Sequence, residues 1–456
     1  MQAGSSFFRQ IQLAPWEDQM KICRPVLFVS LLAFLCVSRA QAQGVTINWA
    51  TTYQEIDGFG ASDAAHYYAL TPGQAELFFS TTSGAGLSLL RTQVPDDGSC
   101  STVNTTCAGQ VTDMQYAISY GARVWSTPWS PPADMKTNNE LLNGGSLLTA
   151  SYSGYANYLA NYSKSLSSLF NIKLYAVSIQ NEPNSAATWA SAVYSPSQMD
   201  TFIGSNLGPT FAADGISTLI MAPETPTWQQ LGAYLTPLVS NSTTLKYAGI
   251  IATHDYNHTG LPAYTSTQLG GKHLWETEVC DHATFDPSIA SALTYAQDIH
   301  DWLTIANASA WHYWWLIGLN GDNEGLLDSA SGVVSKRLYA IGNYSRFVRP
   351  GYYRVDATAN PQSGIYVSAF KNSSGTLVIV AINHNAWSVP VTFTVKGATV
   401  SSVTPWVTSA YVSLSEQSKV SLGSSSFTET LTSNSITTFV GSAVAEPPSN
   451  LVATVH

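Results

Sequence analysis

Eight short apolar runs recur through the first three-quarters of this 456-residue chain, and each ends in polar residues. Roughly 25 to 50 residues separate successive runs, enough for a loop, a helix and a return each time. Apolar residues recur at every third or fourth position in residues 155–170 and 289–306, which indicates amphipathic helices. Eight strand–helix units predict an α/β fold, a (β/α)8 TIM barrel with its functional residues at the C-terminal ends of the strands. The predicted strands are Ile56–Gly60, Leu87–Gln93, Arg123–Trp129, Leu174–Asn181, Thr218–Glu224, Gly249–Tyr256, His273–Val279 and Ala310–Ile317.

The pattern changes after about residue 344. Short alternating runs separated by Ser, Thr and Gly replace the strand–helix units, and this is typical of a side antiparallel β-sandwich domain. Residues Val45–Tyr53 alternate in the same way, so we expect them to pair with the later strands. The predicted sandwich strands are Gly364–Phe370, Thr376–Asn383, Val389–Val395 and Ser435–Gly441.

These patterns divide the chain into five parts. Residues 1–42 are interpreted as a leader with a secretion signal peptide, and residues 43–57 as the N-terminal strand of the side β-domain. Residues 58–344 would form the catalytic barrel and residues 345–442 the side β-sandwich. Residues 443–456 are interpreted as a linker and the start of a truncated further domain.

The leader has the three features of a signal peptide. A basic start at Met20–Arg24 precedes an apolar run from Val26 to Val37, and a small-x-small cleavage site follows at Ala40–Ala42. The apolar run is too short to span a membrane. We therefore expect a secreted protein whose mature chain begins near Gln43.

Composition limits the partners of this protein. Only 11% of the residues are charged and the formal net charge is −10. Nucleic acids and anionic membranes favour clustered Lys and Arg, so neither is an expected partner. The 13 Trp and 23 Tyr are expected mostly in packing, with some forming stacking platforms for sugar rings. No Cys/His spacing suggests a metal site, and we expect a monomer with neither metal nor cofactor.

Three cysteines follow the leader. Cys100 and Cys107 are close enough in sequence for a local disulfide, which would suit an exported protein, and a reduced pair is an equal alternative. Cys280 is left over. No His or Asn pattern supports a catalytic thiol there, so we expect a buried, inert side chain.

Two of the glutamates near predicted strand ends lie in distinctive short segments. Glu182 lies in Ser178–Pro183, at the end of the fourth strand, and Glu278 lies in Leu274–Val279, at the end of the seventh. Glycoside hydrolysis uses two carboxylates, one to protonate the leaving oxygen and one to attack the sugar carbon or activate water. The Asn before the first glutamate and the Pro after it fit a rigid loop that fixes the carboxylate.

Six motifs occur in order along the chain: Gly58–Ser62, Thr127–Pro132, Met135–Asn139, Ser178–Pro183, Trp275–Glu278, and Val334–Arg337 followed by Arg346–Tyr352. Together they resemble glycoside hydrolase family 30, most closely its bacterial xylanase branch, over residues from about 45 to 440. The resemblance implies a TIM barrel with a side β-sandwich and a retaining mechanism. It also implies that Glu182 is the acid/base and Glu278 the nucleophile.

Glu276 is a second candidate for the nucleophile. It lies two residues before Glu278, so on a strand both would face the same side. A position deeper in the barrel is less accessible to substrate. We therefore expect Glu276 to pair with Arg91 or with another inward polar group, because a buried unpaired carboxylate is costly.

Further site residues are predicted at other strand ends. Arg91 would hold the nucleophile ionised or form an ordinary structural salt bridge. Asn181 is expected to bind the sugar 2-OH, and Tyr256 to bind Glu278. The remaining candidates for substrate binding are His254, Glu224, Trp129 and Trp315. His254 could equally be a core residue. The two Trp are candidate platforms for a sugar ring, and core packing is the alternative.

The chain departs from the resembled branch at one strand end. Xylanases that require a glucuronic acid branch carry two arginines just after the tryptophans of the eighth strand, where this chain has Gly318 and Leu319. A carboxylate sugar would lose its bidentate charged partner. In addition, Ala65 stands where a Trp is usual and Gln93 replaces a basic residue, so we expect remodelled subsites.

These observations predict a secreted retaining endo-β-glycanase, best matched to β-1,4-xylan without dependence on glucuronic acid branches. A β-1,6-galactanase or β-1,6-glucanase with the same mechanism is an alternative. A non-catalytic carbohydrate-binding protein is an alternative of another class, and the presence of Glu182, Glu278, Asn181 and Tyr256 speaks against it.

Overall fold

The computed structural model describes residues 43–64, 69–97, 105–257 and 259–446. The predicted signal peptide lies outside the described residues, as do Ala65, Cys100 and most of the predicted truncated domain. The proposed disulfide is therefore not described. Within the described part of the chain, no helix is long and apolar enough to cross a membrane.

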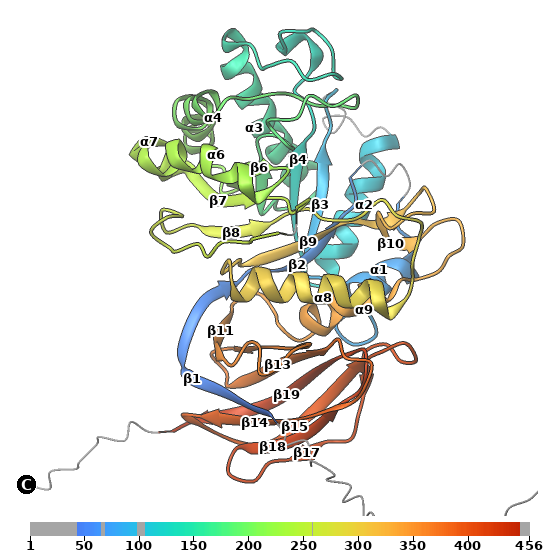
Figure 1. The fold of residues 1–456 in the computed structure, drawn as a ribbon. Coiled ribbons are helices and arrows are strands. Elements are labelled where there is room, and N and C mark those ends of the chain that lie inside the picture. The colour runs from blue at the N-terminus through green and yellow to red at the C-terminus, as the bar shows by residue number, and fades with distance from the viewer. Residues whose placement is uncertain (1–42, 65–68, 98–104, 258, 447–456) are drawn as a thin grey trace, which may run out of the picture. The chain divides into compact units, whose positions relative to one another are not determined.

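Eight parallel strands, β2 to β9 in sequence order, form the predicted barrel, and β8 pairs with β9 to close it (Figure 1). A further strand, β10 (Gly325–Asp328), pairs with β9 outside the ring. Strands β5, β7 and β8 each end three residues before their predicted ends, because the chain leaves the sheet there. The barrel strands are β2 Gly58–Ser62, β3 Leu89–Val94, β4 Arg123–Pro128, β5 Ala176–Ser178, β6 Leu219–Thr225, β7 Ala248–Thr253, β8 His273–Glu276 and β9 Ala310–Gly318.

Helices lie around the outside of the barrel (Figure 1). The helix predicted from residue 155 begins earlier, at Tyr152, and buries Tyr155, Leu159 and Leu166 on one face. It ends at Asn171, whose left-handed φ of 56° stops the helix. The helices are α1 Pro72–Phe79, α2 Thr105–Ser119, α3 Tyr152–Phe170, α4 Pro196–Phe202, α5 Gly208–Ala213, α6 Trp228–Ser240, α7 Ser242–Tyr247, α8 Ile289–Thr304 and α9 Lys336–Ser345, with short 3-10 turns at Ala133–Met135 and Thr149–Ser151 and a π turn at Ile203–Leu207.

Large aromatic side chains fill the barrel interior. Trp125 and Trp275 meet edge to face with ring centroids 6.0 Å apart. The Trp125 indole donates to Nε2 of His312 at 3.1 Å. Burial lowers the pKa of His312 to about 3, so the ring is neutral and its Nδ1 donates to the carbonyl oxygen of Glu276. These contacts hold strands β8 and β9 in position below the site.

The second sheet is the side domain. Its first strand, β1, precedes the barrel in sequence and pairs antiparallel with β11 and parallel with β14, so one pairing in this mainly antiparallel sheet is parallel. The sequence patterns missed β11, β15 and β18. The strands are β1 Gln43–Ile56, β11 Tyr352–Ala357, β12 Ile365–Lys371, β13 Thr376–Asn383, β14 Val389–Lys396, β15 Ala398–Thr408, β16 Ser415–Glu416, β17 Val420–Ser421, β18 Ser426–Leu431 and β19 Ser435–Ala445.

Helix α9 joins the barrel to the side domain through buried hydrogen bonds. Asn343 donates from Nδ2 to the Thr438 hydroxyl at 2.9 Å, and that hydroxyl donates to the Asn343 carbonyl oxygen at 2.6 Å. Both residues are fully buried. Because both side chains are buried, water cannot reach them in the folded protein. The two hydrogen bonds of the Thr438 hydroxyl therefore satisfy polar groups that would otherwise lack a partner.

We predict that Thr438→Val lowers the free energy of unfolding by about 1–3 kcal/mol, because it leaves two buried groups of Asn343 without that partner. Valine matches threonine in size, so packing changes little. The measurement is urea denaturation of the full chain. Thr430→Val, at an exposed position of β18, is the control and should change stability by less than ~0.5 kcal/mol. Equal losses in both variants would contradict a role for this contact.

Candidate active site

Glu182 lies four residues after the end of β5, in a tight turn rather than on the predicted strand. Its φ is 46°, a left-handed conformation that residues other than Gly adopt at a cost. The turn is held by two backbone hydrogen bonds, from Glu182 N to the Glu224 carbonyl at 3.0 Å and from Ser185 N to the Glu182 carbonyl at 2.9 Å. The carboxylate is thereby fixed at the C-terminal mouth of the barrel.

Glu278 lies two residues beyond the end of β8 and is buried except for a small exposed part. Both of its carboxylate oxygens have partners: the Tyr256 hydroxyl donates to Oε1 at 2.6 Å, and the Arg91 guanidinium donates to Oε2. Burial and the charge of Glu278 raise the pKa of Tyr256 well above its usual value, so the phenol remains a donor. The predicted Tyr256–Glu278 contact is present.

Glu276 is fully buried and, of the two predicted kinds of partner, it binds not Arg91 but other inward polar groups. Its Oε1 accepts the backbone N–H of Glu278 at 2.8 Å, and its Oε2 accepts the N–H of His312 at 2.9 Å. Burial raises the pKa of Glu276 well above its usual value. Arg91 instead contacts the carboxylates of Glu224 and Glu278. Glu276 therefore fixes the backbone that carries Glu278.

Arg91 is the centre of the site. It lies within β3, not at its end, and its side chain is fully buried. Besides Glu278, its NH2 group contacts Asn181 Oδ1 at 2.6 Å and Glu224 Oε1 at 3.2 Å. Its guanidinium carbon also lies 4.7 Å from the ring centroid of Trp129. Burial alone would lower the pKa of Arg91, but the charges of Glu224 and Glu278 raise it.

Glu224 is the second carboxylate that Arg91 holds. It is fully buried, and Thr127, which the sequence analysis did not select, donates its hydroxyl to Oε2 at 2.9 Å. Burial would raise the pKa of Glu224, but the charge of Arg91 and the contacts with His254 lower it overall. Glu224 thus remains an anion in the site and balances part of the positive charge.

His254 lies between three carboxylates. Its Nδ1 is 3.4 Å from Glu182 Oε1, and its Nε2 is 3.7 Å from both Glu224 Oε1 and Glu278 Oε2. Burial would lower the pKa of His254, but the charge of Glu278 and the contacts with Glu182 and Glu224 raise it to about 10. The imidazole is therefore a cation at neutral pH. Of the two alternatives from the sequence, the structure favours a residue of the site.

The two predicted catalytic carboxylates lie close together. One carboxylate oxygen of Glu182, one of Glu278 and a ring nitrogen of His254 all lie within 4.8 Å of one another. Three such groups are a possible ligand set for a cation, but the guanidinium of Arg91 already occupies Oε2 of Glu278. A metal ion there would face that positive charge. This close approach of single carboxylate oxygens is compatible with the separation of about 5–5.5 Å between the two carboxyl groups of retaining glycosidases.

Three tryptophans line one side of the site. Trp314 stacks on Trp315 with ring centroids 4.8 Å apart and is 5.8 Å from Trp129. Consecutive residues of a strand normally point to opposite faces, but the register between β2 and β9 shifts between Tyr313 and Trp315. The sequence analysis selected Trp129 and Trp315 and missed Trp314, although the Trp-Trp doublet was a visible signal.

The loops after β8 and β9 form the wall beside Glu278. His282 stacks on the Tyr256 ring at 6.5 Å and pairs with Glu324, whose Oε1 is 3.1 Å from its Nδ1. Gly318 pairs with Asp328 in β10, and a Cβ placed at Gly318 would lie only 3.0 Å from the backbone nitrogen of Gly325. A side chain at Gly318 would therefore require the backbone at Gly325 to shift by a few tenths of an ångström. This wall carries a carboxylate rather than the arginine pair of the resembled enzymes.

Cys280 is free and buried, as the sequence predicts. Its sulfur lies 3.7 Å from the Tyr256 hydroxyl. Burial raises the pKa of the thiol above its usual value, which disfavours the reactive thiolate.

Models of two family domains match this chain. The model for the glycosyl hydrolase family 30 TIM-barrel domain matches residues 108–309, and the model for the family 30 beta sandwich domain matches residues 351–439. Among curated proteins, Glucuronoxylanase XynC of Bacillus subtilis (strain 168) is 31% identical over 410 residues, which are 88% of this chain and 92% of that protein.

Solved structures match over the same extent. The family 30 subfamily 8 xylanase Xyn30A from Clostridium acetobutylicum has 33% identity and a TM-score of 0.78, covering 88% of this chain and 99% of that one. A family 30 endoxylanase from Clostridium papyrosolvens C71 has 32% identity and a TM-score of 0.76, covering 88% of this chain and all of that one, 100%.

We predict that His254 stabilises the fold in a pH-dependent way. Its folded-state pKa of about 10 exceeds the ordinary value near 6.5, so its contribution is complete below about pH 6.5 and is lost as pH rises through about 10. The loss of unfolding free energy caused by His254→Asn should therefore shrink between pH 7 and pH 10, as measured by urea denaturation at several pH values.

The control is His300→Asn. Burial lowers the pKa of His300 to about 4, so this residue is neutral throughout the same range and its contribution should not change. Parallel pH dependences for the two variants would contradict a charged His254.

Proposed function

This chain belongs to glycoside hydrolase family 30, and we propose that it is a secreted, retaining endo-β-1,4-xylanase that does not require glucuronic acid branches on its substrate. The observation that carries the proposal is the pair Glu182 and Glu278, with carboxylate oxygens within 4.8 Å at the mouth of the barrel. A relative named as a glucuronoxylanase, at 31% identity, and one named as a xylanase, at 33% identity, support xylan as the substrate class.

In the first step of this mechanism, Glu278 attacks the anomeric carbon while Glu182 gives its proton to the leaving glycosidic oxygen. The bond from the anomeric carbon to that oxygen breaks, and an ester between the sugar and Glu278 forms. Tyr256 and Arg91 support this role, because each holds one oxygen of Glu278 in place. The nucleophile is thus oriented before the substrate arrives.

In the second step, the Glu182 carboxylate takes a proton from water, and that water attacks the anomeric carbon and releases Glu278. Two displacements at one carbon retain its configuration. His254 lies 3.4 Å from Glu182 and supports the position of its carboxylate for both steps.

Asn181 and the tryptophans support the binding of the sugar. Arg91 donates to the amide oxygen of Asn181, and this orients the amide so that its N–H groups are the donors offered to the 2-OH of the sugar. The Trp129 and Trp315 rings provide apolar surface for the C–H face of a pyranose. All three residues lie at the same C-terminal mouth of the barrel as the two glutamates.

Independence from glucuronic acid is supported by the wall beside Glu278. Gly318 packs closely against β10 and carries no charged side chain, and the loop carries Glu324 close to His282 instead. A sugar carboxylate on this wall would meet like charge, so we propose that unbranched or neutral segments of xylan bind there.

Export is proposed from residues 1–42, whose basic start, apolar run and small-x-small site have the order of a signal peptide. Recovery of the enzyme only from inside its source cells would contradict export.

We predict that Glu278→Gln lowers kcat/KM on xylan by about 10³-fold or more, because the amide is not a nucleophile. Glu276→Gln should retain turnover but lower stability by about 1–3 kcal/mol, because an amide N–H would face a backbone N–H donor. The measurements are steady-state kinetics and urea denaturation of both variants. An inactive Glu276→Gln beside an active Glu278→Gln would reverse the assignment.

The substrate is tested by product profiles on three polymers. We predict neutral xylooligomers from unbranched β-1,4-xylan, released with retained anomeric configuration in proton NMR spectra. Removing the acid branches from glucuronoxylan should leave the rate within about threefold, because no charged partner for them is proposed in the catalytic site. Cleavage of β-1,6-galactan alone would instead support the alternative substrate with the same two glutamates.

A further inference from the structure

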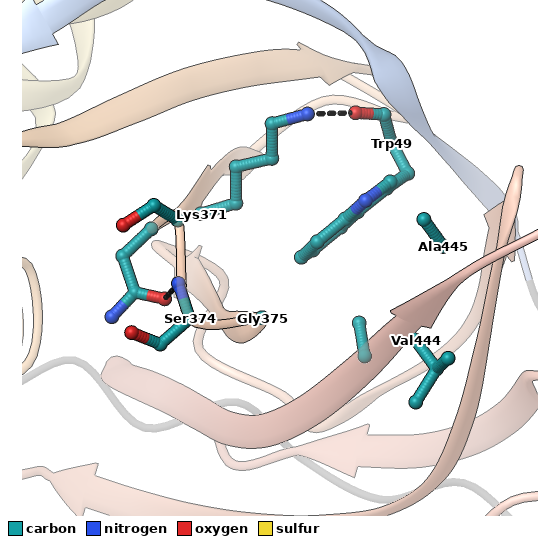
Figure 2. Close-up of a pocket in the computed structure, with 9 residues that line it drawn as sticks. Trp49, Lys371, Ser374, Gly375, Val444 and Ala445 are labelled. Atoms are coloured by element: carbon teal, nitrogen blue, oxygen red, sulfur yellow. Dashed lines mark hydrogen bonds between the residues drawn. The ribbon is translucent and has the colours of Figure 1, made fainter.

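A cavity of about 410 Å³ lies in the side domain, lined by parts of three strands that contribute nothing to the catalytic site. Figure 2 shows Trp49 of β1 between Lys371 and the end of β19. The turn from β12 to β13 supplies the polar wall, and Val444 supplies part of the apolar wall. The cavity is large enough for a sugar residue, since small-molecule sites begin near 300 Å³.

A strand irregularity places Trp49 in this cavity. Asn48 pairs with Asp356 and Thr52 with Val355, so residues 49–51 of β1 have no counterparts in β11. Such a bulge redirects side chains and leaves backbone groups unpaired with the neighbouring strand. The freed carbonyl oxygen of Trp49 accepts a hydrogen bond from Lys371 Nζ at 2.6 Å.

Lys371 is the charged group of the cavity. Its Nζ lies 5.0 Å from the Trp49 ring centroid, and one donor is used by the Trp49 carbonyl, so two N–H donors are left. Among the residues that the structure describes, no carboxylate lies within ion-pair distance of it. Burial alone lowers the pKa of Lys371, without an acidic neighbour to offset it. The partner that would neutralise the ammonium group of Lys371 is an anion.

The turn opposite Trp49 is rigid and polar. The Asn372 side chain accepts N–H groups of Ser374 and Thr376 at 3.0 and 2.8 Å. Gly375 has a φ of 87° and lies so close to β19 that a Cβ there would be 2.6 Å from the Ala443 carbonyl. The hydroxyl-bearing Ser373 and Ser374 are exposed at the rim. Val444, which is 71% exposed, completes the apolar side.

We propose that this cavity is a second, non-catalytic binding site for a uronic acid residue of an acidic polysaccharide. The sugar carboxylate pairs with Lys371, the ring packs on the exposed Val444 beside the edge of Trp49, which is 7% exposed, and the ring hydroxyls bind the serines of the turn. With a net charge of −10, the protein as a whole repels an acidic polymer, so this cation supplies a local attraction. The site does not depend on the catalytic glutamates or on the proposed substrate.

The test is affinity electrophoresis of the full chain in native gels that contain soluble glucuronoxylan. Glu278→Gln serves as the parent so that the polymer is not cut. Adding Lys371→Gln should weaken retardation roughly two- to fivefold, as expected for one partly exposed charge pair. Adding Lys419→Gln, which removes an exposed charge elsewhere in the side domain, is the matched control and should have no effect.

A second variant does not depend on Lys371. Val444→Asp places a carboxylate at an exposed wall position, so the fold is retained while a sugar carboxylate is repelled, and retardation should again fall. In gels with carboxyl-reduced polymer, Lys371→Gln should match its parent. Unchanged retardation in both variants, or equal losses on the carboxyl-reduced polymer, would overturn the uronate site. Turnover of unbranched xylan by the chain with both glutamates intact tests the proposed function separately.

Discussion

The buried guanidinium of Arg91 is the interaction on which the catalytic region depends. It joins side chains from separate parts of the barrel, because Asn181 follows β5, Glu224 lies in β6 and Glu278 follows β8. Burying an arginine without partners would cost much folding free energy. The two carboxylates offset that cost, and the guanidinium in turn holds them in place. The same guanidinium lies over Trp129, which ties the aromatic wall to the charged centre.

Charge balance explains why so many ionisable groups share one small region. Two cations, Arg91 and His254, face Glu182, Glu224 and Glu278, and protonation of Glu182 makes the five groups neutral as a set. This is the state that the first step of the proposed retaining mechanism needs. Loss of that proton would leave one negative charge for the proposed second step. The supporting side chains therefore have an electrostatic role beyond their geometry.

The barrel and the side domain have different roles. The barrel interior is filled with Trp125, Trp275 and His312, which fixes the strands below the site. The side domain begins with β1, before the barrel, and ends with β19, after it. In sequence, the barrel is therefore inserted between the first strand of the side domain and the remaining strands. The bulge in β1 then leaves room for the proposed uronate cavity, separate from the catalytic mouth.

The sequence by itself determined the barrel, the side domain and the two glutamates, because periodic apolar runs and short motifs report local structure directly. It also selected Arg91, Tyr256 and Asn181. Only the tertiary structure decided their partners: Glu276 binds backbone N–H groups and not Arg91, and Trp314 joins Trp315 through a register shift. Pairing between distant residues depends on strand register and on competition for one buried cation. Neither is encoded in the spacing of residues along a single strand, so the fold had to be known first.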